Sequence, residues 1–295
     1  MTTAGTLAAL ESPQAPAARK RAGALRRFSR NPFAVAAVVF LLVVIQAAVL
    51  APVISPHDPN RIVMGATLLS PSATHWLGTD ESGRDEFTRV LYGARISLTI
   101  GVVAMLLSVV LGTAIGALAG VFGGVMDALT MRLTDAMLSI PIFFFLLTVL
   151  AVFGSAVPTI IIAIGLSSWM TAARVVRAEV LRTVNLEYVL AARALGAGGW
   201  RIVLLHLLPS AVPSMMVAST IGVGQAILTE SALSYLGVGV QPPIASWGNM
   251  LSNAQNYFFP APLLAIWPGM MILLTVLSFN FIGDSTRDTL SPYQN

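Results

Sequence analysis

The chain has 295 residues, of which 56% are hydrophobic and only 10% are charged. Soluble domains contain roughly a quarter charged residues, so this composition excludes an ordinary water-soluble protein. The absence of cysteine excludes disulfides, thiolate metal sites and cysteine nucleophiles. The net charge of +4 comes without a basic patch interleaved with aromatic residues, so we expect no nucleic acid partner.

Residues 1–30 form a basic tail that we expect to lie in the cytoplasm. Its positive residues are Arg19, Lys20, Arg21, Arg26, Arg27 and Arg30. The apolar segment 31–56 follows, and it is longer than a signal-peptide core of about 7 to 15 residues. We therefore predict that it is retained as the first transmembrane helix.

Long stretches without charged residues define the other transmembrane spans, because a charge at the bilayer centre is costly and a span needs about 20 residues. The stretch 136–173 is too long for one helix, and Gly154 and Pro158 mark its expected break. Segment 237–260 is rich in Gly, Pro and aromatic residues, so we expect an interfacial loop there. The predicted spans are 33–54, 97–120, 133–152, 158–177, 210–236 and 262–283.

The predicted fold is therefore all-α, a polytopic membrane protein of about six transmembrane helices. An even number of spans puts both termini on one side, and Lys and Arg number thirteen on the predicted inner side against four outside. This bias predicts cytoplasmic termini. The predicted regions after the first span are an extracytoplasmic loop 57–95, a core 96–283 and a cytoplasmic tail 284–295.

The second half of the outer loop is dense in charge around two glycines. Its motif residues are Gly78, Thr79, Asp80, Gly83, Arg84 and Asp85. One interpretation is a packed, specific loop. The alternative is a solvated linker whose acids and arginine pair weakly at the surface.

The inner loop 178–209 is long for a connection between helices, yet it contains helix-forming residues. We predict a short helix starting near Glu187, a stop at Gly196 and a fifth span starting at Pro209, and we call residues 187–209 the elbow. Small Ala191 and Ala192, flanked by Glu187 and Arg193, predict a surface that another protein can approach closely. The alternative is a helix that lies on the membrane.

Several separated segments resemble one family in order. These are Leu190–Ala192 with Gly196 and His206–Pro209, Leu77–Asp85 leading to Tyr92–Leu98, Gly237–Pro243, Ser246–Leu251 with Trp247 and Asn249, and Phe279–Asn280 near the end. They resemble the C-type permease subunits of dipeptide, oligopeptide and nickel ABC importers. Leu190 stands where the family signature has Glu.

The resemblance implies a type I ABC importer permease-like fold in a bacterial inner or plasma membrane. It also implies a homologous second permease, two ATP-binding cassette subunits that use ATP and Mg, and an extracytoplasmic solute-binding protein. The chain itself has no Gly-rich phosphate loop, and its only lysine is Lys20, so we expect no cofactor and no enzymatic activity in it. The residues implied for coupling to the ATPases are Glu187, Ala191, Ala192, Arg193, Gly196 and Pro209.

Gln225, Glu230 and Asn280 are the candidates for the translocation path, because ionisable and amide groups inside a membrane are costly. Glu230 has a second interpretation as a structural carboxylate bonded to its neighbours. The expected solutes are di- or oligopeptides, with nickel chelates, glutathione or haem as alternatives; a stand-alone channel and a membrane enzyme are remote ones. The chain's three histidines, His57, His75 and His206, fall in separate segments, so no metal site is predicted.

Overall fold

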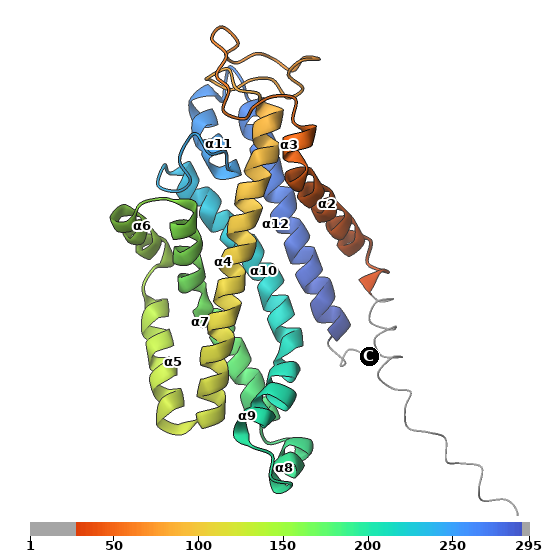
Figure 1. The fold of residues 1–295 in the computed structure, drawn as a ribbon, viewed down its shortest axis with the longest axis vertical. Helices are drawn as coiled ribbons and strands as arrows, with labels where there is room; N and C mark the ends of the chain where they lie inside the picture. Colours follow the sequence, from red (N-terminus) through yellow and green to blue (C-terminus); the bar gives the residue numbers. More distant parts are fainter. Residues whose placement is uncertain (1–27, 291–295) are drawn as a thin grey trace, which may run out of the picture.

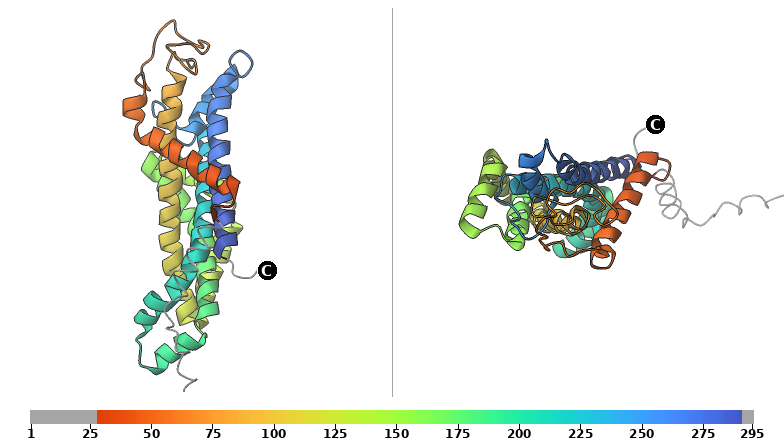
Figure 2. Two further views of the ribbon diagram at one scale, coloured as in Figure 1. Left: turned by 90° about the vertical axis from the view of Figure 1, so that its right-hand side faces the viewer. Right: turned by 90° about the horizontal axis from the view of Figure 1, so that it is seen from above.

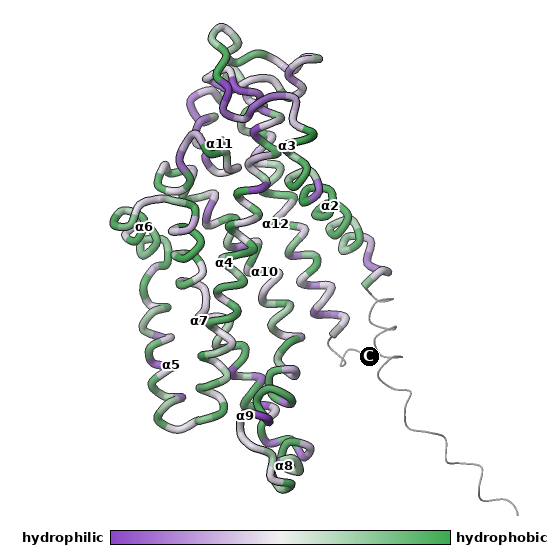
Figure 3. The backbone as a smooth tube through the Cα atoms, viewed as in Figure 1, coloured by the Kyte–Doolittle hydropathy of each residue, from purple (hydrophilic) through white to green (hydrophobic). Residues whose placement is uncertain are grey.

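The computed structural model describes residues 28–290 as an elongated bundle of helices (Figure 1). The basic residues predicted at positions 19–27 lie outside these residues. Among the described residues there is no β-strand, only an isolated bridge between Thr79 and Asp85. A loop-rich cap, residues 55–85, lies at one end of the bundle, and the elbow lies at the other. Figure 3 shows hydrophobic residues along the helices and hydrophilic residues gathered in the cap.

The first predicted span is a helix in two pieces, α2 (Pro32–Val49) and α3 (Ala51–Ile54). Asn31 caps α2 by accepting a hydrogen bond from the backbone N–H of Phe33 at 3.1 Å. The break follows from Pro52, which offers no backbone donor. Figure 2 shows α2 crossing the bundle obliquely, where it packs on α12 and α4.

Two long helices, α4 (Glu86–Phe122) and α7 (Val157–Thr183), pack along much of their lengths at the centre of the fold. Gly112, Gly116 and Gly120 of α4 face α7 so closely that a Cβ at any of them would collide with it. A glycine at every fourth position lets the two backbones approach. Helix α4 starts at Glu86, so the predicted outer loop 57–95 is too long by ten residues.

The predicted third span, 133–152, is not a single helix. The segment consists of α5 (Gly124–Ser139) and α6 (Ile142–Phe153), which meet at 83°. Pro141 explains the bend, because a proline disfavours helical backbone in the preceding residue, and Ile140 is extended at φ −81° and ψ 125°. The break predicted near Gly154 is present, and Gly154 ends α6 with φ +80°.

The elbow contains α8 (Glu187–Ala194) and α9 (Gly199–Ile202), and it leads through a π-helical turn, η1 (Val203–Leu207), into α10 (Leu208–Tyr235). The helix is continuous from Gly199, and Pro209 lies in the first turn of α10, close to the predicted start of the fifth span. The wide π turn precedes Pro209 and accommodates a ring that would clash with the carbonyl four residues earlier.

The predicted loop 237–260 contains a short helix, α11 (Trp247–Ala254), packed against α10, α12 and α4. A 3₁₀ turn, η2 (Gln255–Tyr257), follows, and α12 (Leu263–Leu290) ends the described chain. The predicted inner tail 284–295 is therefore helical through Leu290. By length and composition, the described residues contain five helices able to cross a membrane, or six spans if the bent pair α5 and α6 is one. This agrees with the predicted fold class.

Candidate coupling elbow and cap

The helix α8 extends beyond the ends of α4 and α5 (Figure 1) and is anchored by one side chain. Val189 is fully buried in a cluster with Val176 and Val180 of α7 and Leu207 of the π turn. The rest of α8 faces outward. Among the predicted coupling residues on it, Glu187, Ala191 and Arg193 are exposed and Ala192 is half-buried.

Gly196 ends α8 through backbone geometry that favours glycine. It has φ +81°, in the left-handed region, and its N–H donates to Arg193 O at 2.9 Å while the N–H of Ala197 donates to Ala192 O at 3.0 Å. These two bonds form a Schellman motif, which satisfies the last carbonyls of a helix. The predicted helix stop is therefore correct.

Apolar side chains surround the exposed alanine face. Tyr188 and Leu190 are about half exposed, and Leu195 is 89% exposed. Such a group of exposed apolar residues marks a surface that contacts another protein or a membrane. Both interpretations made from the sequence therefore fit this surface by composition.

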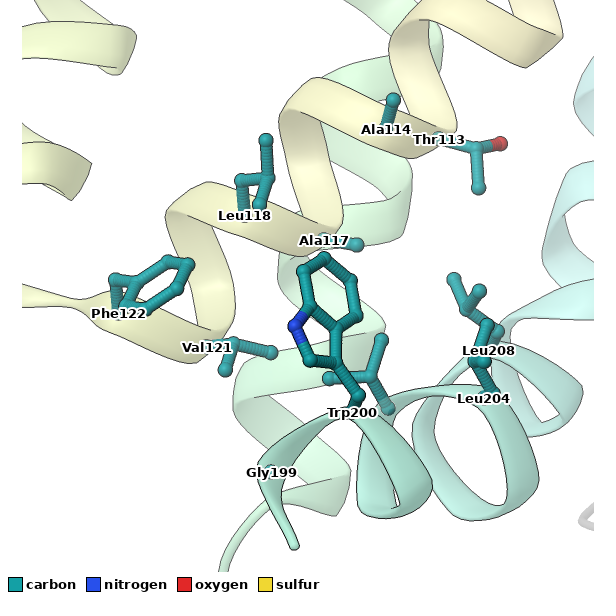
Figure 4. A pocket seen from close by; sticks show the side chains of 11 residues that line it. Thr113, Ala114, Ala117, Leu118, Val121, Phe122, Gly199, Trp200, Leu204 and Leu208 are labelled. Carbon is teal, nitrogen blue, oxygen red and sulfur yellow. The ribbon is translucent and has the colours of Figure 1, made fainter.

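An apolar groove of about 340 Å³ lies between the elbow and the C-terminal end of α4. Figure 4 shows Trp200 of α9 pointing toward Ala117 and Leu118 of α4. Trp200 is 67% exposed, so this side of the elbow is loosely packed compared with the side held by Val189. The elbow thus packs against α7 and against Ala117 of α4, and the groove lies beside this contact.

At the opposite end, Asp80 is the centre of the cap. Its Oδ1 accepts hydrogen bonds from the backbone N–H of Ser82 and Arg84, both at 2.9 Å, and its Oδ2 accepts from Arg84 Nε at 2.6 Å. Asp80, Arg84 and Arg89 are 4%, 7% and 1% exposed. The alternative of a solvated linker with weak surface pairs is therefore wrong, because these charges are buried and bonded.

The two glycines of the motif permit close backbone contacts inside the cap. Gly78 and Gly83 have φ +86° and +76°, and a Cβ on either would collide with a backbone carbonyl oxygen, that of Leu69 and Val63 respectively. Thr79 holds two segments of the cap together, because its Oγ1 accepts a hydrogen bond from the backbone N–H of Leu69 at 2.9 Å. The cap is a folded unit.

Asp85 and Trp247 attach the cap and α11 to α4. Asp85 caps α4, and its Oδ2 accepts from the backbone N–H of Thr88 at 2.9 Å. Trp247 is fully buried, and its Nε1 donates to Val90 O at 3.1 Å. Asn249 stabilises the start of α11, because its Oδ1 accepts from Ser246 N–H at 3.1 Å in a capping box.

Glu230 is fully buried and bonded to serines from two helices. Its Oε2 accepts from Ser97 Oγ of α4 at 3.1 Å, and its Oε1 accepts from Ser234 Oγ at 2.7 Å. Ser97 Oγ in turn accepts from the backbone N–H of Trp247 at 3.2 Å. This arrangement fits the structural interpretation of Glu230, because the carboxylate joins α4, α10 and α11.

The other two path candidates lie apart from Glu230. Gln225 is exposed on α10, and Asn280 of α12 is half-buried beside Gly224. Within this chain the three candidates therefore do not form one polar site.

The histidines are arranged differently from the prediction. His206 lies in the elbow against Tyr188, as expected, but the His57 and His75 rings pack with centroids 4.8 Å apart at the cap. Asp85 joins them, and the three residues offer ligand atoms within 4.8 Å of one another. Spacing along the chain could not indicate this, because a folded loop brings the two rings together.

Two segments of the chain match the descriptions of known protein families. Residues 112–293 match "Binding-protein-dependent transport system inner membrane component", and residues 21–71 match "N-terminal TM domain of oligopeptide transport permease C". The chain belongs to this family of ABC importer permeases. It is thus a multi-pass permease subunit of the peptide and nickel importer group, as its motifs predicted.

Relatives of the permease align over most of its length. A glutathione transport system permease protein from Pectobacterium atrosepticum is 40% identical over 268 residues, covering 90% of this chain and 89% of the relative. A dipeptide transport system permease protein from Bacillus subtilis is 39% identical, covering 96% and 88%. A nickel transport system permease protein from Escherichia coli is also 39% identical, covering 81% and 86%.

Among solved structures, the permease is similar to a chain of the MetNI methionine ABC transporter. The TM-score is 0.57 at 19% identity, and the match covers 70% of this chain and 98% of the other. At this identity the likeness shows the fold alone, and it confirms the predicted type I importer architecture.

Sequence reasoning missed the serines that bond Glu230 and the role of Trp247 inside the fold. Ser97 and Ser234 are ordinary residues of apolar helices when each is considered alone. A signal existed for Ser234, which lies four residues after Glu230 and therefore on the same helix face. No comparable spacing links Ser97 to Glu230, since 133 residues separate them.

Proposed function

We propose that this permease forms the translocation path for di- or oligopeptides together with a homologous second permease. Two ATP-binding cassette subunits would hydrolyse ATP with Mg, and an extracytoplasmic solute-binding protein would deliver the solute at the cap. The termini and the elbow would face the cytoplasm. The Arg-rich inner segments support this orientation through the positive-inside rule.

The observation that supports coupling is the construction of the elbow. One side of α8 is fixed to α7 by Val189, and the opposite side presents Ala191 beyond the ends of α4 and α5. The half-buried Ala192 lies at the edge between these two sides. A small-residue face allows a partner to approach the helix backbone closely. The exposed neighbours Tyr188 and Leu190 supply apolar area for the ATPase to cover.

The outer half of α10 is the surface that best fits the path. Gln225, Leu228, Ala232 and Tyr235 lie three or four residues apart and are exposed, so they share one face of the helix. A face left uncovered in the single chain is available to the second permease, with the path between the two subunits. We place Gln225 on the path and Glu230 behind it as a structural support.

Sequence identity does not select one solute, because the relatives named for glutathione, dipeptide and nickel transport are 40%, 39% and 39% identical to this chain. Glutathione is itself a peptide, so two of the three names favour a peptide solute. Nickel chelates and haem are the alternatives. Competition of unlabelled peptides, glutathione, nickel chelate and haem against uptake of a labelled dipeptide in whole cells tests this part.

The test of coupling uses the reconstituted complex of all subunits in liposomes. We expect Ala192→Glu to abolish stimulation of ATP hydrolysis and solute uptake, because the added charge lies where the ATPase approaches. Ala192→Ser and Ala192→Gly are the controls at the same position, since both keep this position small and add no charge. Both controls should keep stimulated hydrolysis near that of wild type. Normal stimulated hydrolysis and uptake with Ala192→Glu would refute the docking assignment.

Two further measurements distinguish a subunit of an ABC importer from a stand-alone channel. Purified permease alone in liposomes should not conduct solute, and solute flux without ATPases would instead indicate a channel. Subunits co-purified with the tagged chain and identified by mass spectrometry should include two ATPases and a second permease. Recovery of the chain alone from gently solubilised membranes would contradict the proposed assembly.

A further inference from the structure

A cluster of two imidazoles and a carboxylate in the cap is not used by the proposed function. His57 follows α3, His75 lies in the middle of the cap, and Asp85 is the first capping residue of α4. The imidazole ring centroids are 4.8 Å apart, and each of the three residues offers a ligand atom within 4.8 Å of the others. Three separate segments therefore meet at one point.

Hydrogen bonds select the tautomer of each ring. The Nδ1 of His75 lies 2.8 Å from Asp85 Oδ1, and the Nε2 of His57 lies 2.9 Å from the carbonyl oxygen of Thr74. Since an ionised carboxylate and a carbonyl only accept, both of these ring nitrogens bear a proton. The opposite nitrogens, Nε2 of His75 and Nδ1 of His57, then have free lone pairs in the neutral rings. Each imidazole is thus prepared to act as a ligand.

The scaffold holds the cluster from behind. Oδ2 of Asp85 is engaged by the backbone N–H and the Oγ1 of Thr88, at 2.9 and 2.7 Å, which leaves Oδ1 directed at His75. Ser55 Oγ donates to the carbonyl of His57 at 2.7 Å and lies 3.0 Å from Thr88 Oγ1. Supporting hydrogen bonds of this kind orient the ligands of protein metal sites.

We propose that His57, His75 and Asp85 bind a divalent transition-metal ion of the Zn²⁺ and Ni²⁺ class. Two imidazoles with a carboxylate suit these ions, whereas Mg²⁺ and Ca²⁺ prefer oxygen ligands alone. Ligands at about 2.0–2.2 Å from a tetrahedral Zn²⁺ lie roughly 3.3–3.6 Å apart, so the ligand atoms must move together by roughly 1 Å. His57 and His75 are only half-buried, so their rings can rotate to do so. Asp85 acts as the third ligand or orients His75, and water fills the remaining positions.

A bound ion would link His57, which follows the first span, to His75 and to Asp85 at the start of α4. It would therefore stabilise the part of the cap nearest the helices. Binding requires neither ATP nor transport. The proposal is therefore independent of the proposed import function, and either can fail without the other.

The experiment uses the full chain purified in detergent through an affinity tag without histidines. Isothermal titration with ZnCl₂, and separately with NiCl₂, should give one ion per chain. His57→Asn and His75→Asn should each raise the Kd by more than about tenfold, since even loss of an orienting partner costs about 10- to 100-fold. The matched control is His206→Asn, which removes an imidazole from the elbow and should bind like wild type.

A second measurement does not depend on the variants folding. X-ray absorption at the Zn edge of the wild-type chain with one equivalent of ZnCl₂ should show two imidazole ligands. Absence of stoichiometric binding by wild type would overturn the proposal. So would unchanged affinity in the His57→Asn, His75→Asn double variant, or a Zn spectrum with no imidazole scattering.

Discussion

The contact between α4 and α7 can be tested by adding one methyl group. Gly112→Ala would place a Cβ 2.7 Å from Trp169 O and 2.8 Å from Ala173 N of α7. These are backbone atoms, so they cannot rotate away as a side chain would. The nearest atom of α7 is Ala172 Cβ, at 2.5 Å from the added Cβ, so α7 would have to retreat by roughly 0.9 Å to reach ordinary van der Waals contact. A gap of that size forfeits a quarter to a half of the dispersion energy at neighbouring contacts.

Two opposing terms decide the size of the effect. Overpacking of a tight contact costs about 1–3 kcal/mol, whereas replacing Gly by Ala inside a helix gains up to about 1 kcal/mol in intrinsic propensity. We expect a net loss of about 1–2 kcal/mol for Gly112→Ala and a larger loss for Gly112→Val. The control is Gly199→Ala in α9, where nothing lies within 4 Å of the added Cβ and the same propensity gain applies.

The assay is thermal stability of the full chain in detergent, followed by size-exclusion chromatography of a fluorescent fusion after heating. Gly112→Ala should melt a few degrees below wild type, at about 2–4 °C per kcal/mol, and Gly199→Ala should melt at or above wild type. If Gly112→Ala were as stable as Gly199→Ala, the close approach of α4 and α7 would be wrong.

Three other substitutions test the cap and the buried carboxylate. Arg84→Met removes the Nε donor from Asp80, whose side chain is 5% exposed, but two backbone N–H donors and Arg89 Nε at 3.5 Å remain. We therefore expect the cap to lose about 1–3 kcal/mol and limited proteolysis of residues 60–85 to accelerate. Gly83→Ala must hold a φ of +76° against Val63 O and should accelerate the same cleavage, whereas Gly65→Ala, with open space around it, should do so less. Glu230→Leu leaves the hydroxyls of Ser97 and Ser234 without their acceptor, whereas Glu230→Gln keeps one. We therefore expect a lower yield of monodisperse protein from Glu230→Leu than from Glu230→Gln. Equal yields would contradict the hydrogen-bonded role of Glu230.

The helices could largely be predicted because a bilayer requires long apolar segments, and a segment's hydropathy depends only on its own residues. The break at Gly154 and the stop at Gly196 were readable for the same reason, since each depends on one residue and its immediate neighbours. The bend at Pro141 was equally local and was missed because its flanks are uniformly apolar. A proline inside an apolar run should therefore be treated as a break even when hydropathy does not fall.

The cap and the support of Glu230 depend on contacts between distant residues, which no local pattern encodes. Asp80 and Arg84 look like surface charges in the sequence, and only the folded loop shows that both are buried. The meeting of His57 with His75 has the same origin. The resemblance pointed to these motif residues, and the structure gives their physical role in building the cap.

The unbroken helix from Gly199 to Tyr235 has a mechanical consequence. Its 37 residues span roughly 55 Å at about 1.5 Å per residue, which exceeds the hydrocarbon core of a bilayer. A rod of that length magnifies motion, because a tilt of about 5° at the elbow moves the opposite tip by roughly 5 Å. Glu230 lies near that tip and is bonded to α4. Displacement of the elbow would thus strain the hydrogen-bonded joint at Glu230, near the other end of the same helix.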